Sequence, residues 1–346
     1  MIDDLALIVL GIALLVWSAD RFTDGAAALA NNFGVSPLII GLTIVAIGSS
    51  APEILVSITS AISGSPELAV GNALGSNIAN IAFVVGLTAL VKPLQVESNI
   101  LRREFPILFL VSATAGILLF DGVLGKIDGI ILLSGLVVYI LWLVRTAKNT
   151  SPKEKDNIVE ELIEELPDAM PNGKAVLYVI TGGIVLAVSS RILVFSASNI
   201  ALQLGVSELV VGLTVIALGT SLPELAASIA GVMKNEHEMA VGNVIGSNIF
   251  NLLAVLGIPG LFSVITLENS VFYRDYLLML ALTTALFFLA YGFNKPGRIT
   301  RLEGSLLFMT YLAYTAYLVM LSIDQAQAPT QTAENCIMTL DQAHNV

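Results

Sequence analysis

GLTIVAIGSSAPE at residues 41–53 and AVGNALGSNIAN at residues 69–80 return as GLTVIALGTSLPE at residues 212–224 and AVGNVIGSNIFN at residues 240–251. Both motifs are displaced by 171 residues, and residues 34–80 align with 205–251 without a gap at 24 identities in 47 positions. Each copy carries one glutamate, Glu53 or Glu224, inside a strongly apolar run. A carboxylate in such a run is costly and by default marks an ion or proton pathway. The duplication therefore predicts a transporter built from internal repeats, with its site where the repeats meet.

The composition assigns the chain to the lipid bilayer. Its 346 residues are 56% hydrophobic and 12% charged, with a mean hydropathy of +0.86. A soluble domain carries about 25% charged residues. The few basic residues do not form the extended patch that nucleic-acid binding needs, so we expect no nucleic-acid partner. The single cysteine, Cys336, lies in a polar tail and excludes a disulfide within the chain.

The apolar runs predict an all-α membrane protein of ten transmembrane helices. Five spans separate each helix from its copy, and because five is odd, the two five-helix repeats are inverted. We expect the first repeat, with motif 41–80, at 1–146, a connecting loop at 147–173, the second repeat, with motif 212–251, at 174–323, and a polar tail at 324–346. The predicted spans lie near 5–30, 35–62, 67–91, 103–120, 126–146, 175–203, 207–233, 239–263, 273–292 and 303–323.

Basic residues predict the orientation, because cytoplasmic loops carry the excess of lysine and arginine. With the N-terminus outside, the inside loops hold 12 of these residues and the outside loops hold only Lys126 and Arg274. Both termini are therefore expected outside the cytoplasm.

The first motif predicts oxygen ligands at the glutamate. Ala46, Ser49 and Glu53 share one face of a helix. Pro52 lacks an N–H and clashes with the carbonyl of Gly48, so the helix should kink and leave carbonyl oxygens free. Free carbonyls at this depth are tolerated where they face protein or a wet cavity, and a cation could accept them as ligands. The second motif repeats the pattern with Ala217, Thr220, Pro223 and Glu224.

The partner motif adds hydroxyl and amide groups, with Ser76 above Asn80 and, in the copy, Ser247 above Asn251. The glycines at small-xxx-small spacing permit close helix contact. All the converging groups are oxygen donors, which favour Ca²⁺, Na⁺ or Mg²⁺ over Zn²⁺ or copper. Two carboxylates carry a charge of −2, which one Ca²⁺ or two Na⁺ would neutralise. Ser57 and Ser228 are expected to bond their own helix backbone rather than to act as ligands.

An alternative interpretation is that Glu53 and Glu224 are protonated and only hydrogen-bond to neighbouring helices. The equivalent placement of the two glutamates, each after a proline and each near a Ser/Asn pair, argues against this purely structural role.

The paired G-x-x-x-x-x-x-G-[ST]-S-x-P-E and G-N-x-x-G-S-N-I-x-N motifs resemble the α-repeats of the calcium/cation antiporter superfamily, and most closely prokaryotic sodium/calcium exchangers of the inner membrane. The resemblance covers nearly the whole chain. It implies alternating access with the two long opening helices sliding across the bundle. It also implies Glu53 and Glu224 as central Ca²⁺ ligands with the backbone oxygens of Ser49 and Thr220. The implied Na⁺ sites are framed by Ala46, Ser49, Ser76 and Glu53 and by Ala217, Thr220, Ser247 and Glu224, with Ser50, Ser221, Asn80 and Asn251 lining the centre.

The chain departs from the family pattern at the centre, because some exchangers have an aspartate where this chain has Asn251. Ca²⁺/Na⁺ exchange is the leading hypothesis, and Ca²⁺/H⁺ exchange is the close alternative because buried carboxylates bind protons readily. A sodium-coupled symporter for a small solute is more distant, since nothing indicates an organic pocket. An enzyme would need unlike residues in unlike roles, and the polar groups are duplicated. We expect no cofactor and no obligate protein partner.

Overall fold

The computed structural model describes residues 2–34, 40, 44, 46–96, 98–149, 170–234, 237–291 and 297–344. Within these residues the chain is helical apart from four strands of two or three residues. Most of the predicted connecting loop at 147–173, and Gly41 at the start of the first motif, lie outside the described residues. The predicted domain boundaries therefore stay predictions.

The first half of the chain contains a long opening helix followed by shorter helices interrupted near the repeated motifs. Its elements are α1 (Ile2–Asn32), α3 (Ala46–Ser49), α4 (Ala51–Ser63), α5 (Pro66–Ile78), η2 (Ala79–Val85), α6 (Gly86–Val91), β1 (Leu94–Val96), α7 (Ser98–Leu119), β2 (Val123–Leu124) and α8 (Lys126–Asn149).

The second half repeats this order. Its elements are α10 (Asn172–Leu204), α11 (Glu208–Val211), η3 (Gly212–Ile216), α12 (Ala217–Thr220), α13 (Leu222–Lys234), α14 (His237–Phe250), η4 (Asn251–Val255), α15 (Gly257–Phe262), β3 (Ile265–Thr266), η5 (Val271–Tyr276), α16 (Leu277–Ala290), β4 (Gly297–Ile299) and α17 (Arg301–His344).

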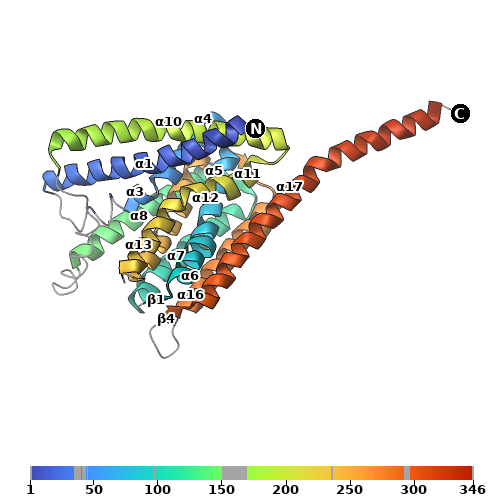
Figure 1. The fold of residues 1–346 in the computed structure, drawn as a ribbon. Coiled ribbons are helices and arrows are strands. Elements are labelled where there is room, and N and C mark those ends of the chain that lie inside the picture. The colour runs from blue at the N-terminus through green and yellow to red at the C-terminus, as the bar shows by residue number, and fades with distance from the viewer. Residues whose placement is uncertain are drawn as a thin grey trace.

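Eight helical stretches among the described residues are long and apolar enough to cross a membrane. The other two predicted spans, 35–62 and 103–120, coincide with shorter apolar helices at Ala51–Ser63 and Glu104–Leu119. Helix α17 does not end at residue 323 as predicted for the tenth span but continues to His344. Figure 1 shows it leaving the body of the bundle.

The first half changes from α-helix to π-helix directly after its GSNI sequence, and the second half does so one residue further on. The π-helical segment η2 begins at Ala79, and η4 begins at Asn251. Such single-turn insertions are frequent at functional sites because they re-aim side chains and free backbone groups. Asn80 and Asn251 therefore lie where the helix geometry changes in each half.

Two short antiparallel ribbons join the halves. Strand β1 pairs with β4, with Leu94 opposite Ile299, and β2 pairs with β3, with Leu124 opposite Ile265. The offset of 171 residues places β1 against β3 in the alignment, so each ribbon takes one strand from each half. Since one membrane helix, α7, separates β1 from β2, the two ribbons lie at opposite ends of the bundle.

The opening helices α1 and α10 run antiparallel and side by side along one flank of the bundle (Figure 1). Small residues permit this contact. A Cβ added at Gly25 would lie 2.7 Å from the carbonyl oxygen of Ala175, and one at Gly182 would lie 2.7 Å from the backbone nitrogen of Phe22. Without a hydrophobic driving force between helices in lipid, this close backbone packing is a main source of association.

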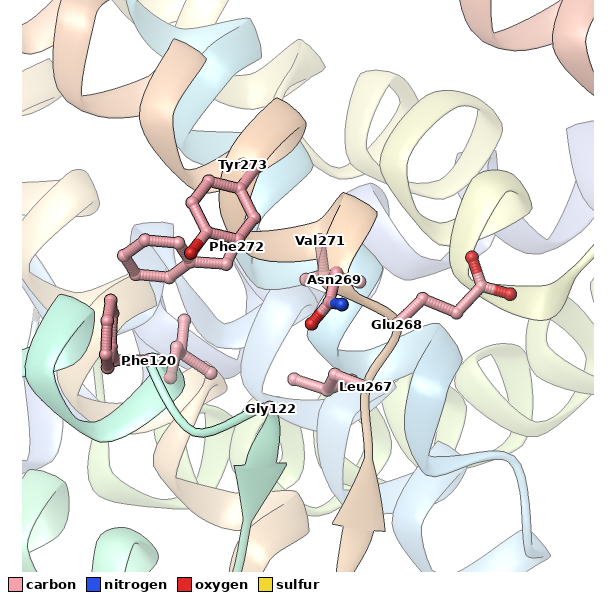
Figure 2. A pocket seen from close by; sticks show the side chains of 9 residues that line it. Phe120, Gly122, Leu267, Glu268, Asn269, Val271, Phe272 and Tyr273 are labelled. Carbon is pink, nitrogen blue, oxygen red and sulfur yellow. The ribbon is translucent and has the colours of Figure 1, made fainter.

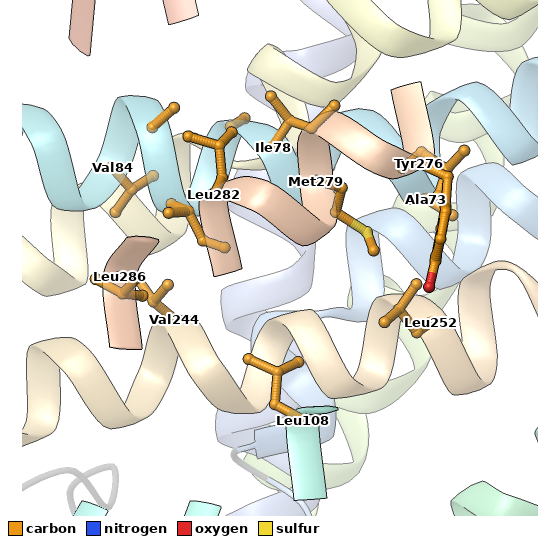
Figure 3. Close-up of a cluster of buried hydrophobic side chains, with 14 of the residues drawn as sticks. Ala73, Ile78, Val84, Leu108, Val244, Leu252, Tyr276, Met279, Leu282 and Leu286 are labelled. Carbon is orange, nitrogen blue, oxygen red and sulfur yellow. The ribbon is translucent and has the colours of Figure 1, made fainter. Parts of the chain in front are cut away.

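A second close contact joins the two repeats at their motifs, where α5 packs against η3. Gly71 and Gly212 face each other across it, and a Cβ at either would overlap a backbone carbonyl, of Leu209 or Leu68 respectively. The close contact predicted at Gly242 and Gly246 is absent among the described residues, since a Cβ at Gly242 would meet nothing nearer than 3.8 Å and one at Gly246 nothing within 4 Å. Gly71, one of the glycines predicted for close packing, holds the two motif-bearing helices together with Gly212. Around them lies an apolar cluster that includes Ala73, Ile78 and Met279 (Figure 3).

The described residues include one short ion pair, between Arg274 and the buried Asp275. The guanidinium Nε and Nη2 donate to the two carboxylate oxygens at 2.6 and 2.9 Å, and the Tyr314 hydroxyl donates to Oδ1 at 2.7 Å. Arg274, counted with the outside loops in the sequence, lies in η5 and neutralises this carboxylate. The hydrogen bond from Tyr314 to Asp275 links η5 to α17.

We predict that Gly212→Ala lowers the midpoint of thermal unfolding in detergent, because its methyl group has to displace the Leu68 carbonyl. Overpacking of this kind costs about 1–3 kcal/mol. Gly173→Ala is the matched control, since a Cβ there meets no heavy atom of the described structure within 4 Å. Unfolding of Gly212→Ala at the wild-type temperature would contradict the contact.

Candidate cation site

The chain breaks at one serine in each half, immediately before the glutamate. Ser50 separates α3 from α4 with φ −90° and ψ 7°, and Ser221 separates α12 from α13 with φ −85° and ψ 1°. The predicted kink is therefore present in both copies, and it interrupts the continuous helix expected from Ala46 to Glu53. Each glutamate falls in the first turn of the following helix, where the helix dipole favours negative charge.

The two glutamates, one from each half, are both buried in the interior, and the segment before Glu224, α12, packs against α4, which carries Glu53. Glu53 is 0% exposed and Glu224 is 1% exposed. Their carboxylates are close enough to interact electrostatically. Neither side chain faces lipid. Arg274 is not available as their counter-charge, because its guanidinium is already paired with Asp275. The structure thus buries two acidic side chains whose ionised forms would need a counter-charge.

Unpaired buried oxygens lie on the segments that carry the glutamates and on the π-helical segments η2 and η4 that pack against them. Among the described residues, these oxygens have no hydrogen-bond partner: both carboxylate oxygens of Glu53, Oε2 of Glu224, the hydroxyls of Ser50 and Ser221, and the amide oxygens of Asn80 and Asn251. Buried polar groups are nearly always paired. Their concentration on helices that pack on one another indicates a place for a ligand with positive charge.

Helix α5 of the first half is tied to the second half by a polar network around Thr220. The Thr220 hydroxyl donates to Oδ1 of Asn72 at 3.3 Å and lies 3.4 Å from the Ser76 hydroxyl. Ser76 also donates to Asn72, and the Asn72 amide donates to the backbone oxygen of Glu53, both at 3.4 Å. Ser76 and Thr220, predicted for opposite Na⁺ sites, therefore lie together.

The remaining predicted residues are distributed as follows. The Ser247 hydroxyl donates to Oε1 of Glu224 at 3.4 Å, and the Asn80 amide donates to Oδ1 of Asn248 at 3.0 Å. Ala217 is fully buried, and a Cβ at Gly75 would lie 2.7 Å from its methyl group. Ser49 is half-buried, and the side chain of Ala46 lies outside the described residues.

The sequence interpretation missed three asparagines and misjudged two serines. Asn72, Asn77 and Asn248 are buried among the site helices, and their identity in both motif copies was a signal that could have found them. The expectation that Ser57 bonds its own helix is wrong, since its hydroxyl donates to the Val255 carbonyl at 2.7 Å. In lipid a partner from the other half satisfies this hydroxyl as well as its own helix would. The Ser228 hydroxyl, expected to bond its own helix backbone, has no hydrogen-bond partner among the described residues.

The donor set suits a hard cation. It consists of carboxylate, hydroxyl and amide oxygens, which are the ligands of Ca²⁺ and Na⁺. No group of three or more His, Cys, Asp or Glu side chains in the described part of the chain is placed to hold a metal. A site with two acidic side chains and several neutral oxygens would attract a cation with little net charge, so it can also release that cation.

A surface cleft beside β2 and β3 is separate from this arrangement. Figure 2 shows its lining, and none of the predicted site residues contributes to it. Three of its nine lining residues are aromatic, and the rings of Phe120 and Phe272 are in edge-to-face contact with their centroids 5.4 Å apart. The lining residues are Leu119, Phe120, Gly122, Leu267, Glu268, Asn269, Val271, Phe272 and Tyr273.

The family model described as "Sodium/calcium exchanger protein" matches residues 4–145 and 174–320. The chain belongs to this exchanger family. The Escherichia coli inner membrane protein YrbG is 43% identical over 318 residues, covering 92% of this chain and 97% of that protein. Sodium/calcium exchanger MaX1 of Methanosarcina acetivorans is 28% identical over 345 residues, covering 90% and 97%.

Solved structures of the sodium-calcium exchanger NCX_Mj match with a TM-score of 0.61 at 33% identity, over 91% of this chain and 98% of that chain. The predicted fold class is confirmed, with two inverted five-helix repeats in an all-α membrane protein. The family is one of exchangers rather than enzymes, and it implies Ca²⁺ and Na⁺ as transported ions.

We predict that Ca²⁺ raises the unfolding midpoint of the purified protein and that Glu53→Gln and Glu224→Gln each remove most of this increase. An ion that binds only the folded state stabilises it by about 2.7 kcal/mol at a concentration of 100 times its Kd. The comparison is the shift on adding Ca²⁺, because removing a buried charge itself changes the baseline. Glu268→Gln, at an exposed carboxylate, is the control and should keep the full shift.

Proposed function

We propose that this protein exchanges Ca²⁺ for Na⁺ across the inner membrane by alternating access. The observation that carries the proposal is the meeting of Glu53 and Glu224, one from each inverted repeat, in a buried cluster of unpaired oxygens. One Ca²⁺ or two Na⁺ would neutralise their charge of −2. We assign the ligand role to these two glutamates together with Ser49, Ser50, Ser76, Asn80 and Ala46 of the first half and Thr220, Ser221, Ser247, Asn251 and Ala217 of the second.

Exchange, rather than one-way flow, follows from the electrostatics of this site. Enclosing two unneutralised carboxylates in a low-dielectric interior is costly. Occupied forms are close to neutral and can rearrange, whereas the empty form is held back. Each passage of Ca²⁺ in one direction is then coupled to return of a counter-ion in the other.

Ca²⁺/H⁺ exchange is the second candidate, and one feature of the site favours it. The centre carries amides at both symmetric positions, Asn80 and Asn251, so the glutamates are the acidic groups of the proposed ligand set. Two protons would neutralise these carboxylates as completely as two Na⁺.

A flux experiment separates the two candidates. We predict that reconstituted vesicles loaded with Na⁺ and diluted into Na⁺-free medium take up ⁴⁵Ca²⁺, and that vesicles with an acidic lumen but no Na⁺ gradient do not. Glu53→Gln and Glu224→Gln should each abolish uptake, because one charge cannot balance Ca²⁺, while Glu268→Gln transports normally. Uptake driven by the pH gradient alone would select Ca²⁺/H⁺ exchange, and ordinary turnover in either site variant would remove that residue from the site.

We also propose that both termini lie outside the cytoplasm, on the basis of the 12 to 2 distribution of basic residues. Alkaline phosphatase fused after Val346 should be active, and green fluorescent protein at the same point should be dark. Fusions after residue 160, within the predicted inside loop, serve as the inverse control. A fluorescent C-terminal fusion would reverse the assignment.

A further inference from the structure

Two buried asparagines form a hydrogen bond between the halves at the centre of the bundle. The amide nitrogen of Asn80, at the start of the π-helical segment η2, donates to Oδ1 of Asn248 on α14 at 3.0 Å. Both side chains are at most 1% exposed. This bond leaves Oδ1 of Asn80 without a partner among the described residues. The bond therefore fixes the orientation of the Asn80 amide and leaves its oxygen available to a cation.

The inverted repeats contain the mirror image of this pair. The offset of 171 residues relates Asn80 to Asn251 and Asn77 to Asn248. Helix α5, which carries Asn77, packs against η4, which begins at Asn251, just as α14 packs against η2. The same two residue types are thus presented to each other at the equivalent place.

The mirror bond is not made in this structure. Within the described part of the chain, neither end of the Asn251 amide has a hydrogen-bond partner, and neither has Oδ1 of Asn77. The Asn77 nitrogen donates to the sulfur of Met279 at 3.4 Å, and thioether sulfur is a weak acceptor. A buried donor and a buried acceptor on packed segments are left unsatisfied, which is costly.

The serines beside these asparagines differ between the halves in the same way. Ser76 donates to Asn72 within its own helix, whereas Ser247 donates to the carboxylate of Glu224. These residues are identical in the two motifs. Equal sequences in unequal arrangements are expected of inverted repeats, whose halves exchange conformations as the site changes the side that it faces.

We propose that Asn248 and Asn77 are positioning residues that hold the two central amides in turn. Asn248 holds Asn80 in the conformation seen here, and Asn77 holds Asn251 in the conformation that opens to the opposite side. In each conformation one amide is fixed with its oxygen toward the site, and the other is released. This proposal rests on the exchange function and adds two residues that act through the ligands rather than as ligands.

The test uses Asn248→Leu and Asn77→Leu, each of which removes one bond while keeping the side-chain volume similar. Loss of Asn248 should depopulate the present conformation, and loss of Asn77 should depopulate its opposite. Apparent affinity on each face falls with the population of the conformation open to that face. We therefore expect the ratio of the apparent Ca²⁺ KM values in right-side-out and inverted membrane vesicles to shift about two- to tenfold, the effect of one hydrogen bond, in opposite directions.

The double variant Asn248→Leu/Asn77→Leu should return the ratio to near its wild-type value, because it penalises both conformations. Thr283→Val is the matched control: its buried hydroxyl bonds its own helix at the Met279 carbonyl, so the ratio should not move. Shifts of both single variants in the same direction, or no shift in either, would overturn the proposal. Alanine replaces leucine in the same scheme for any variant that does not reach the membrane.

A second readout does not depend on which ion is transported. In ion-free protein, hydrogen exchange at the last turns of α4 and α13, which are mirror-related, should change in opposite directions in the two leucine variants. Opposite changes in hydrogen exchange, without Ca²⁺ uptake by the wild type, would contradict the ion-exchange function and keep the positioning role. Ca²⁺ uptake by the wild type, with identical hydrogen exchange in the two variants, would keep the ion-exchange function and contradict the positioning role.

Discussion

Two carboxylates without a permanent counter-charge, buried where the repeats meet, constrain the rest of this structure. Glu53 and Glu224 are almost entirely shielded from solvent. The positive charge of Arg274 is already neutralised by Asp275 and does not compensate them. An uncompensated charge in the interior is expensive enough that a protein usually removes it. Among the described residues, each acid lies in the N-terminal turn of its helix, and Glu224 also accepts a hydrogen bond from the Ser247 hydroxyl. The missing positive charge has to arrive with the transported ion.

The helix breaks, the prolines and the glycines are consequences of that constraint. A proline two residues after each break prevents the helix from closing its hydrogen bonds at the site. Glycines then let the backbone of the other half approach, Gly71 against Gly212 at the repeat interface and Gly75 against Ala217 beside it. Helix α1 contacts both broken segments, Gly48 through Thr23 and Gly219 through Ile12. A displacement of α1 therefore alters the surroundings of both glutamates at once, which couples the two halves of the site mechanically.

The sequence could predict the inverted architecture, the kinks and the two acids, because each depends on a local signal. An apolar run, a proline before a glutamate and an odd number of spans between copies need no knowledge of tertiary contacts. The partners of the buried polar groups could not be predicted in this way. Asn72, Asn77, Asn80 and their copies all lie on helices rich in small residues, and periodicity does not say which of them meets the other half. Ser57 illustrates the same limit, since the carbonyl that it bonds lies 198 residues away.

The two central residues are chemically identical, but their hydrogen bonds differ. Because both central positions are asparagine, and the neighbouring Gly-Ser-Asn-Ile sequences are identical, the residues themselves provide no reason for Asn80 to be bonded while Asn251 is not. Under the proposal above, the difference is conformational, and a rearrangement of the two halves reverses it. An aspartate at one of these positions would fix a charge difference between the halves and favour one arrangement permanently. Two neutral amides keep the two arrangements close in energy, which is what a carrier needs if its site is to open to either side of the membrane with comparable ease.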